Sequence, residues 1–168
     1  MAQQLILGID PGFSGALAWY CPEDKRLIAA VPMPLKPPSA IAPGERQRAE
    51  IDPIRLAQII HRAGVPRIAV VEKVSASPQM GVTSAFRFGE GHGIILGVLA
   101  AMGVPVRPAW PSVWKSGLGL SSDKKASLKL AVELFPEWSV TFTRDARSAD
   151  LSEAALLAYF GVRFLPTE

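Results

Sequence analysis

The sequence is poor in residues that crosslink proteins or bind zinc. Cys21 is the only cysteine among its 168 residues, so the chain cannot form an internal disulfide or a cysteine-based zinc site. We therefore expect a protein of the reducing cytoplasm. The two histidines, His61 and His92, are expected to be surface or packing residues rather than metal ligands.

The chain also lacks long hydrophobic runs and a strong excess of either charge. Its longest apolar stretch, residues 93–104, is shorter than the roughly 20 residues of a spanning helix, so we expect no membrane association. The first residues carry no basic segment, and Asp10 interrupts the apolar run after them, so we expect no signal peptide. The formal net charge of +3 is only a weak indication of an anionic partner.

Apolar residues are abundant, at 49 % of the chain, which excludes a disordered protein and allows a substantial core. We expect one domain over residues 1–168. Short apolar runs bounded by turn residues predict five strands. These are residues 6–10, 16–21, 27–31, 67–72 and 104–109. Short turns between the first three favour antiparallel pairing, and the helix before the fourth favours a crossover and parallel pairing.

Helical spacing of apolar residues predicts the remaining elements. Asp52 is a candidate N-cap of the first helix, with Pro53 at its first position and Gly64 at its end. Further helices are expected over residues 83–102, 124–134 and 146–160, with a short helix or turn beginning at residues 110–115. The segment Ser121-Ser122-Asp123 is expected to cap the helix over residues 124–134. The predicted fold is α/β: a mixed five-stranded sheet, strands one to three antiparallel and four to five parallel, with helices on both faces.

Two segments depart from this regular pattern of strands and helices. The proline-rich residues 32–53 exclude regular structure, and we expect an exposed loop within the domain. On the helix over residues 83–102, Gly89, Gly93 and Gly97 lie four apart and share one face. That face is equally well explained by tight packing on the sheet and by contact with a second copy of the chain. Phe86 and Phe88 on the same helix are expected in the core.

Four carboxylates carry the predicted chemistry. Asp10 and Glu72 each end a buried apolar run, at the carboxyl ends of strands, where open sheets place their ligand sites. Asp150 and Glu153 share one face of the last helix, at the border of its buried side. Carboxylates brought together repel unless a cation separates them, so the set predicts an oxygen-ligand site for Mg²⁺ or Mn²⁺. Two such ions about 4 Å apart can drive phosphodiester cleavage.

Taken singly, these carboxylates have simpler explanations. A turn cap explains Asp10 equally well, and a solvated helix residue is the simpler explanation of Asp150. Asp145 competes with Asp150 as a ligand, although it precedes the helix proper. The combination is much more specific than any one member.

The segments Gly-Ile-Asp-Pro-Gly at 8–12, Val-Glu at 71–72 and Asp-Leu-Ser-Glu-Ala at 150–154 resemble RuvC-type Holliday junction resolvases of the RNase H-like superfamily. Residues 88–93 and 111–115 resemble the Gly-rich helix and basic loop of the phage and prophage branch. The resemblance covers nearly the whole chain. It implies a homodimeric endonuclease of four-way DNA junctions with two Mg²⁺ or Mn²⁺ ions per site. The implied catalytic ligands are Asp10, Glu72, Asp150 and Glu153.

The chain departs from the family pattern at three places, one of which is the proline-rich segment 32–53, which is longer than expected. Glu153 stands where the bacterial enzymes usually have Asp, and the loop after Glu72 lacks the aromatic residue often found there. These departures concern the choice of substrate more than metal chemistry. The same metal site would serve a nuclease of flaps, forks or RNA–DNA hybrids, and a junction-binding protein without cleavage is a further alternative. The actin-like ATPases share Gly-Ile-Asp-Pro-Gly but need two such domains, and this chain has room for one.

Phosphate contacts are expected from basic side chains near the site. A helix N-terminus favours phosphate at Lys124 and Lys125, whereas a solvated helix face explains Lys129 equally well. The candidates for DNA binding are Lys73, Arg87, Lys115, Lys124, Lys125 and Lys129.

Overall fold

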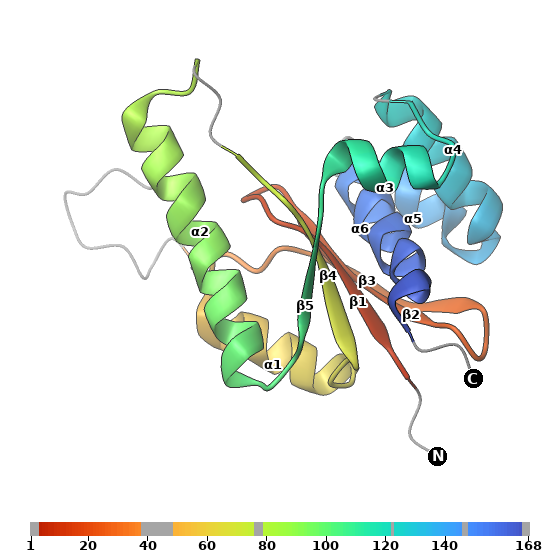
Figure 1. Ribbon diagram of the computed structural model, residues 1–168, viewed down its shortest axis with the longest axis horizontal. Helices are drawn as coiled ribbons and strands as arrows, with labels where there is room; N and C mark the ends of the chain where they lie inside the picture. Colours follow the sequence, from red (N-terminus) through yellow and green to blue (C-terminus); the bar gives the residue numbers. More distant parts are fainter. Residues whose placement is uncertain (1–3, 38–48, 76–78, 122, 146–147, 166–168) are drawn as a thin grey trace.

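The protein is built on a five-stranded mixed sheet with helices on both faces (Figure 1). The computed structural model describes residues 4–37, 49–75, 79–121, 123–145 and 148–165, without the side chain of Lys124. The strands are β1 (Ile6–Asp10), β2 (Ala16–Cys21), β3 (Arg26–Pro32), β4 (Ile68–Glu72) and β5 (Val106–Ala109). The helices are α1 (Pro53–Ala63), α2 (Val82–Ala101), α3 (Pro111–Gly117), α4 (Lys124–Leu134), α5 (Ser139–Thr143) and α6 (Ser148–Phe160), with short 3-10 turns η2 (Pro136–Trp138) and η3 (Gly161–Phe164).

The strand order is β3-β2-β1-β4-β5, and it confirms the predicted pairing. The hairpins β1–β2 and β2–β3 are antiparallel, because two short turns join them. The pairs β1–β4 and β4–β5 are parallel, because α1 and α2 carry the chain back across the sheet between these strands. The carboxyl ends of β1, β4 and β5 therefore lie at one edge of the sheet, between α2 and α3 (Figure 1).

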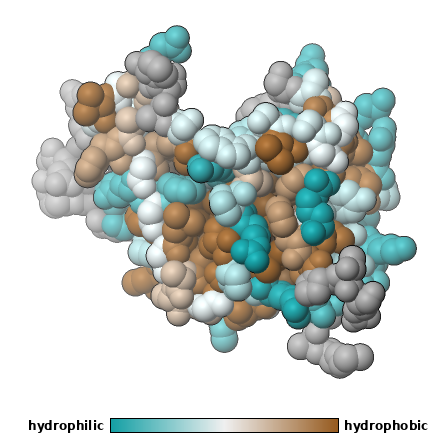
Figure 2. Space-filling model, in the orientation of Figure 1, coloured by the Kyte–Doolittle hydropathy of each residue, from teal (hydrophilic) through white to brown (hydrophobic). Residues whose placement is uncertain are grey.

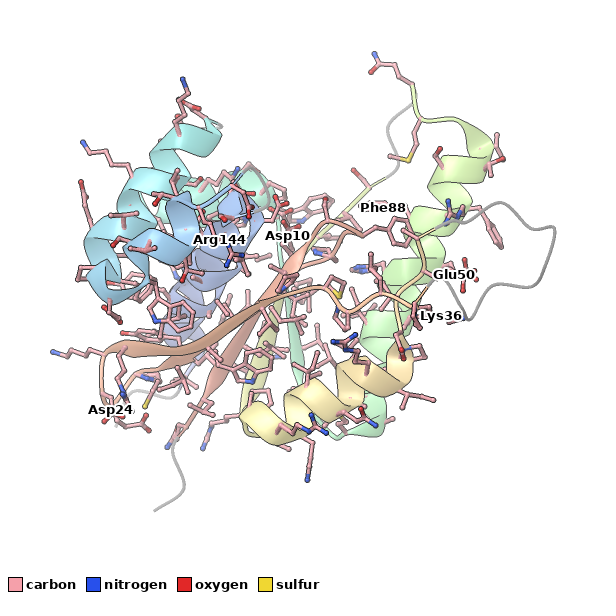
Figure 3. The ribbon with its side chains drawn as sticks, turned by 180° about the vertical axis from the view of Figure 1, so that it is seen from behind. Asp10, Asp24, Lys36, Glu50, Phe88 and Arg144 are labelled. Carbon is pink, nitrogen blue, oxygen red and sulfur yellow. The ribbon has the colours of Figure 1, made fainter. Side chains whose placement is uncertain are left out.

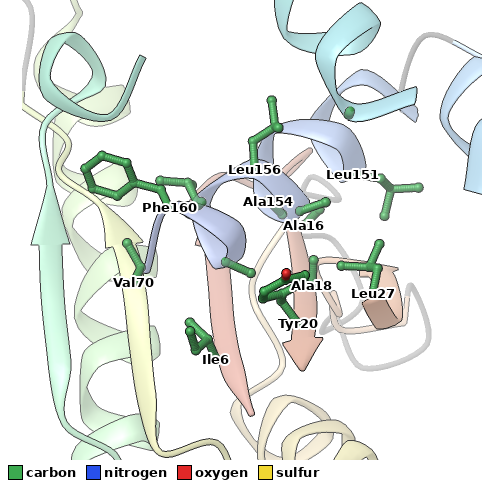
Figure 4. Close-up of a cluster of buried hydrophobic side chains, with 14 of the residues drawn as sticks. Ile6, Ala16, Ala18, Tyr20, Leu27, Val70, Leu151, Ala154, Leu156 and Phe160 are labelled. Carbon is green, nitrogen blue, oxygen red and sulfur yellow. The ribbon is translucent and has the colours of Figure 1, made fainter. Parts of the chain in front are cut away.

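Alternating side chains divide the strands between two hydrophobic cores. Ile6 of β1 and Val70 of β4 point to the face covered by α6, where they pack with α6 residues such as Leu156 and Phe160 (Figure 4). The intervening residues of the same strands point to the opposite face and pack with α1 and α2. Predicted core positions of α6 are confirmed: Leu151, Ala154, Ala155, Leu157 and Ala158 are all buried.

Close packing of α6 on β1 depends on Gly8. A Cβ atom at this position would overlap main-chain atoms of Ala154 and Ala158. Further along, a Cβ at Gly161 would press on the side chains of Ile6 and Val70. Residue numbers along β1 therefore rise as those along α6 fall, so the carboxyl end of β1 lies near the start of α6.

The glycine face of α2 does not pack on the sheet. Gly89, Gly93 and Gly97 are exposed, and a Cβ atom at any of them would meet nothing within 4 Å. The helix instead buries Gly91, Ile95 and Leu99. The sheet-packing explanation of the glycines is therefore wrong. The core assignment of Phe86 is also wrong, because its side chain is 73 % exposed, whereas Phe88 is half-buried.

Local signals for helix ends are largely confirmed. Asp52 accepts a hydrogen bond from the main-chain N–H of Arg55, and Asp123 accepts one from Lys125. The short helix α5 was not expected, because its five residues carry no periodic pattern. Within the described part of the chain, no helix is long and apolar enough to cross a membrane.

The proline-rich segment is less exposed than its composition suggested. Its two ends are buried at Met33 and Ile51, where they join the core beneath α1 and α2. An isolated antiparallel bridge pairs Leu35 with Ile51, and Lys36 forms an ion pair with Glu50 at 2.7 Å (Figure 3). The expectation of an exposed loop is thus wrong for its ends, and residues 38–48 lie outside the described residues.

Candidate active site

Asp10 and Glu72 lie side by side at the carboxyl edge of the sheet. The parallel register pairs Ile9 with Val71, so the next residue of each strand is one of the two carboxylates. Asp10 lies two residues after Gly8, which packs under α6, and Glu72 lies two residues after Val70 of the α6 core. Every second residue of a strand points to the same face, so both carboxylates lie on the face that α6 covers. Figure 3 shows Asp10 at this end of the sheet, between the α4–α6 group and α2.

The start of α6 brings the other two predicted carboxylates to the same place. Gly161 packs on Ile6, and the segment 154–158 packs on Gly8. Two strand residues advance about 6.6 Å, which equals four to five helix residues at about 1.5 Å each. One further step from Gly8 to Asp10 therefore corresponds to about residues 150–153 of α6, the interval from Asp150 to Glu153.

Helix α3 contacts two of these carboxylates through consecutive residues. The indole Nε1–H of buried Trp114 donates to Oε1 of Glu72 at 2.8 Å. The next residue, Lys115, forms an ion pair from Nζ to Oε1 of Glu153 at 2.8 Å. Glu153 is only 6 % exposed, and a carboxylate so deeply buried is costly unless a positive charge compensates it. Lys115 supplies that charge.

The donor set fits a hard divalent cation in its chemistry. All four groups are carboxylates, which suit Mg²⁺ or Mn²⁺, and the site already holds one positive charge at Glu153. Over the described ranges, no three His, Cys, Asp or Glu side chains are arranged so that they could hold a metal ion. The four carboxylates share one end of one face, where α3 contacts Glu72 through Trp114 and Glu153 through Lys115.

Asp145 has a different role from Asp150. Its Oδ1 accepts hydrogen bonds from the main-chain N–H and the hydroxyl of Ser148 at 3.1 Å each, and its own N–H donates to that hydroxyl. Reciprocal bonds of this kind satisfy the free N–H groups at a helix start. Asp145 therefore caps α6, while Asp150 lies within the first turn of the helix.

The predicted DNA-binding residues are distributed unevenly around the site. Lys115 lies inside it, and Lys73 follows Glu72 with its Nζ 4.4 Å from the centroid of the Trp110 ring. Arg87 is on α2, where it donates to the carbonyl of Ala49 at 2.6 Å. On α4, Lys125 is exposed and Lys129 is 3.9 Å from Glu133, while the Lys124 side chain lies outside the described atoms.

Sequence reasoning missed the two tryptophans that flank the site. Trp114 is buried and bonded to Glu72, whereas Trp110 is 46 % exposed at the end of β5. Neither follows from local pattern, because both depend on how α3 lies against β4 and α6. The one available signal was the position of Trp110 directly after a strand that ends at the carboxyl edge.

No protein-family model and no curated protein matches the sequence. Solved structures match its fold. RuvC of Thermus thermophilus is 22 % identical with a TM-score of 0.64, covering 95 % of this chain and 96 % of that one. The same RuvC in complex with a Holliday junction substrate is 20 % identical with a TM-score of 0.61, covering 96 % of each chain.

The chain has the fold of the RuvC resolvases. A third match is the yeast mitochondrial Holliday junction resolvase, at 17 % identity and a TM-score of 0.56, covering 95 % of this chain and 78 % of that one. These matches confirm the predicted RNase H-like α/β fold with its mixed sheet. The likeness covers nearly the full length of this chain, so β1, β4 and α6 all fall within it.

Proposed function

We propose that the protein is a metal-dependent endonuclease that cuts branched DNA, with the four-way Holliday junction as its substrate. The observation that carries the proposal is the placement of Asp10 and Glu72 on one sheet face beside the start of α6, which holds Asp150 and Glu153. The RuvC fold adds support, because one of its matches is a complex with a Holliday junction.

The four carboxylates are the proposed ligands of two Mg²⁺ or Mn²⁺ ions. Bound ions would supply an activated water and stabilise the leaving oxygen of a phosphodiester. The chain's own residues prepare the site: Trp114 orients Glu72, and the ion pair with Lys115 holds the buried Glu153 in place. Lys115 also places a cation where a phosphate would approach, and the exposed Lys125 adds positive charge at the start of α4.

One observation favours a second candidate, a protein that binds junctions without cutting them. The ion pair between Lys115 and Glu153 satisfies a carboxylate that a metal ion would otherwise need. If this pair persists on DNA, the site lacks a ligand and binding occurs without cleavage. RNase H-like cleavage of flaps, forks or RNA–DNA hybrids remains the other alternative, and it differs only in substrate.

A panel of synthetic substrates tests the proposal. We expect Mg²⁺- or Mn²⁺-dependent cutting of four-way junctions in preference to linear duplex, flaps and RNA–DNA hybrids. Asp10→Asn and Glu72→Gln should each lower the cleavage rate at least about 1000-fold while junction binding stays equal or becomes tighter, because carboxylates repel phosphate. Wild-type cutting by Asp10→Asn would refute the proposed site, and binding without any cutting by wild type would favour the second candidate.

We also propose that the protein acts as a homodimer through α2. Val82 and Phe86 are 87 % and 73 % exposed, and they continue the exposed stripe of Gly89, Gly93 and Gly97. The glycines allow two helix backbones to approach closely, and the apolar side chains gain from burial. Gly93→Leu should convert the dimer to monomers in sedimentation experiments. A wild type that is monomeric at tens of micromolar, roughly where a weak dimer still forms, would contradict this interface.

A further inference from the structure

A cavity of about 640 Å³ lies at the end of the sheet opposite the carboxylates. Tyr20 lines it, and this residue pairs with Ile6 at the start of β1, whereas Asp10 ends the same strand. Four strand residues span about 13 Å, so the cavity lies well apart from the candidate active site. The rest of its lining comes from the turn after β2, the end of α6 with η3, and the ends of α3 and α4. Ligand cavities in proteins commonly measure about 300–1,000 Å³.

The walls of this cavity are mainly aromatic and are fixed by the core. The rings of Tyr20, Phe135 and Tyr159 meet edge to face, with centroids 5.5 to 6.3 Å apart. Phe160 at the end of α6 and Leu118 after α3 extend the apolar surface. Figure 2 shows hydrophobic residues at the surface over α6 and below α3, with hydrophilic residues among them. Because core packing holds the rings, the cavity is formed before any ligand binds.

The cavity also contains a polar group that the chain leaves available. Tyr20 is 4 % exposed, and within the described part of the chain its hydroxyl has no hydrogen-bond partner. Burial raises the pKa of Tyr20, so the hydroxyl stays protonated at pH 7 and can donate a hydrogen bond. A carbonyl or carboxylate oxygen of a ligand would satisfy this donor.

Two cationic side chains lie at the rim of the cavity. Cζ of Arg163 on η3 lies 3.8 Å from the centroid of the Phe160 ring, and Nη2 donates to the carbonyl of Gly117 at 3.4 Å. The guanidinium is thus supported by the ring, and since it carries five N–H donors, most of them stay available to a carboxylate. Lys25 is exposed and approaches from the turn between β2 and β3.

Nearby carboxylates do not neutralise this rim. Asp24, next to Lys25, forms an ion pair with Arg26 at 3.4 Å. Glu23 accepts a hydrogen bond from the thiol of Cys21 at 3.3 Å. No Asp or Glu is among the described residues that line the cavity. An apolar interior with a cationic rim favours a ligand that joins an apolar group to negative charges.

Apolar surface continues beyond the cavity along η3. Val162 and Phe164 are partly exposed there, and the Phe164 ring packs edge to face on Phe160, with centroids 5.8 Å apart. A compact small molecule would fill the cavity alone and leave these side chains in water. An extended peptide segment would cover both the cavity and the adjoining surface of η3.

We infer that this cavity, with Arg163 and Lys25 at its rim, is a docking site for an acidic segment of a partner protein that inserts one large apolar side chain. The inserted side chain would pack on the aromatic walls, and Tyr20 would donate to a carbonyl of the segment. Flanking Asp or Glu residues would pair with Arg163 and Lys25. Docking here leaves the carboxyl edge of the sheet open to DNA, and it does not depend on the proposed nuclease activity.

A panel of short fluorescein-labelled peptides tests the docking site. Each peptide carries one Phe, Trp, Leu or Met within a run of Asp and Glu, and binding to the full chain is measured by fluorescence anisotropy. We expect at least one peptide to bind with a Kd of about 1–100 µM at low salt. Replacing its apolar residue by Ser, or its acidic residues by Asn and Gln, should weaken binding at least about tenfold. Added salt should also weaken it, because the rim charges are exposed.

Three variants of the protein locate the site. Arg163→Gln should weaken binding about tenfold, because it removes the charged donors at the rim. Lys25→Asn should weaken it by a smaller factor, and Asn tolerates the positive φ of 52° at this position. Leu118→Trp fills the cavity and should abolish binding, with Tm measured to confirm that each variant folds. The matched control is Arg55→Gln, which removes an exposed cation of α1 on the other face of the sheet and should bind like wild type.

The outcomes separate the docking site from the nuclease. If no peptide binds more tightly than about 1 mM, or if Arg163→Gln binds as well as wild type, the docking site is refuted. Displacement of the peptide by four-way junction DNA would also refute it, because the peptide would then occupy the DNA surface. Arg163→Gln should cut junctions at the wild-type rate. Peptide binding with this pattern in a protein that cuts no DNA would refute the nuclease proposal alone.

Discussion

Helices α6 and α2 cover opposite faces of the same sheet in very different ways. Ten of the 13 residues of α6 are buried, and the helix lies against β1 and β2 along its length. Only three of the 20 residues of α2 are buried, and its main packing partner is α1. The difference separates two tasks. The helix with the candidate ligands is packed tightly on the sheet, whereas the longer helix is more exposed.

Tight packing matters because metal chemistry requires carboxylates held to within fractions of an ångström. Asp150 and Glu153 are held in place because α6 is packed directly on β1. Gly8 allows this close packing, since it has no Cβ atom. On α2, by contrast, the exposed glycines and Phe86 do not contribute to packing within the monomer. Large exposed apolar residues of this kind mark interaction surfaces.

The largest difference in stability is expected when a glycine is replaced by alanine at the α6–β1 contact and, separately, on α2. Gly8→Ala should lower the free energy of unfolding by about 4 kcal/mol, because its Cβ overlaps main-chain atoms that cannot move independently. Gly93→Ala should raise that of the monomer by up to about 1 kcal/mol, because alanine favours helix and meets no neighbour. Urea unfolding at a low micromolar protein concentration measures the free energy of unfolding of both variants. Equal effects would mean that α6 and α2 are packed alike.

A smaller effect is expected at the contact between α3 and α6. Lys115→Met should cost about 3 kcal/mol without metal, because Glu153 then stays buried without its ion pair. Millimolar Mg²⁺ or Mn²⁺ should restore part of this loss, so the metal-induced rise in Tm should be larger in Lys115→Met than in wild type. Asp10→Asn should show a smaller rise than wild type. Equal rises in all three proteins would place the metal elsewhere.

The smallest effect concerns a single hydrogen bond. Trp114→Phe keeps a buried aromatic ring but removes the donor to Glu72, at a cost of about 1–2 kcal/mol in the free energy of unfolding. If Trp114 orients Glu72, the variant should also need more Mg²⁺ for half-maximal stabilisation. Leu99→Met, a buried substitution on α2 in the core of the opposite sheet face, is the control and should leave that metal concentration unchanged. If the variant is less stable but needs the same Mg²⁺ concentration for half-maximal stabilisation, Trp114 contributes to packing and does not orient Glu72.

Most of the fold could be predicted because its signals are local. Alternating or continuous apolar runs located all five strands, and Asp52 and Asp123 marked helix starts through bonds within three residues. The short α5 was missed, since its packing depends on α4 and α6 rather than on its own periodicity. Phe86 was misplaced because apolar character indicates burial but does not say whether it occurs within the chain or against another molecule.

The candidate site divides in the same way. The sequence by itself determined that Asp10 and Glu72 end parallel strands and that Asp150 and Glu153 share a helix face, because strand direction and helical spacing are properties of contiguous residues. Only the tertiary structure decided that Lys115 pairs with Glu153, that Trp114 bonds to Glu72 and that Lys73 lies over Trp110. These contacts join residues 37 to 42 positions apart in the chain, and their geometry depends on how whole helices pack against the sheet.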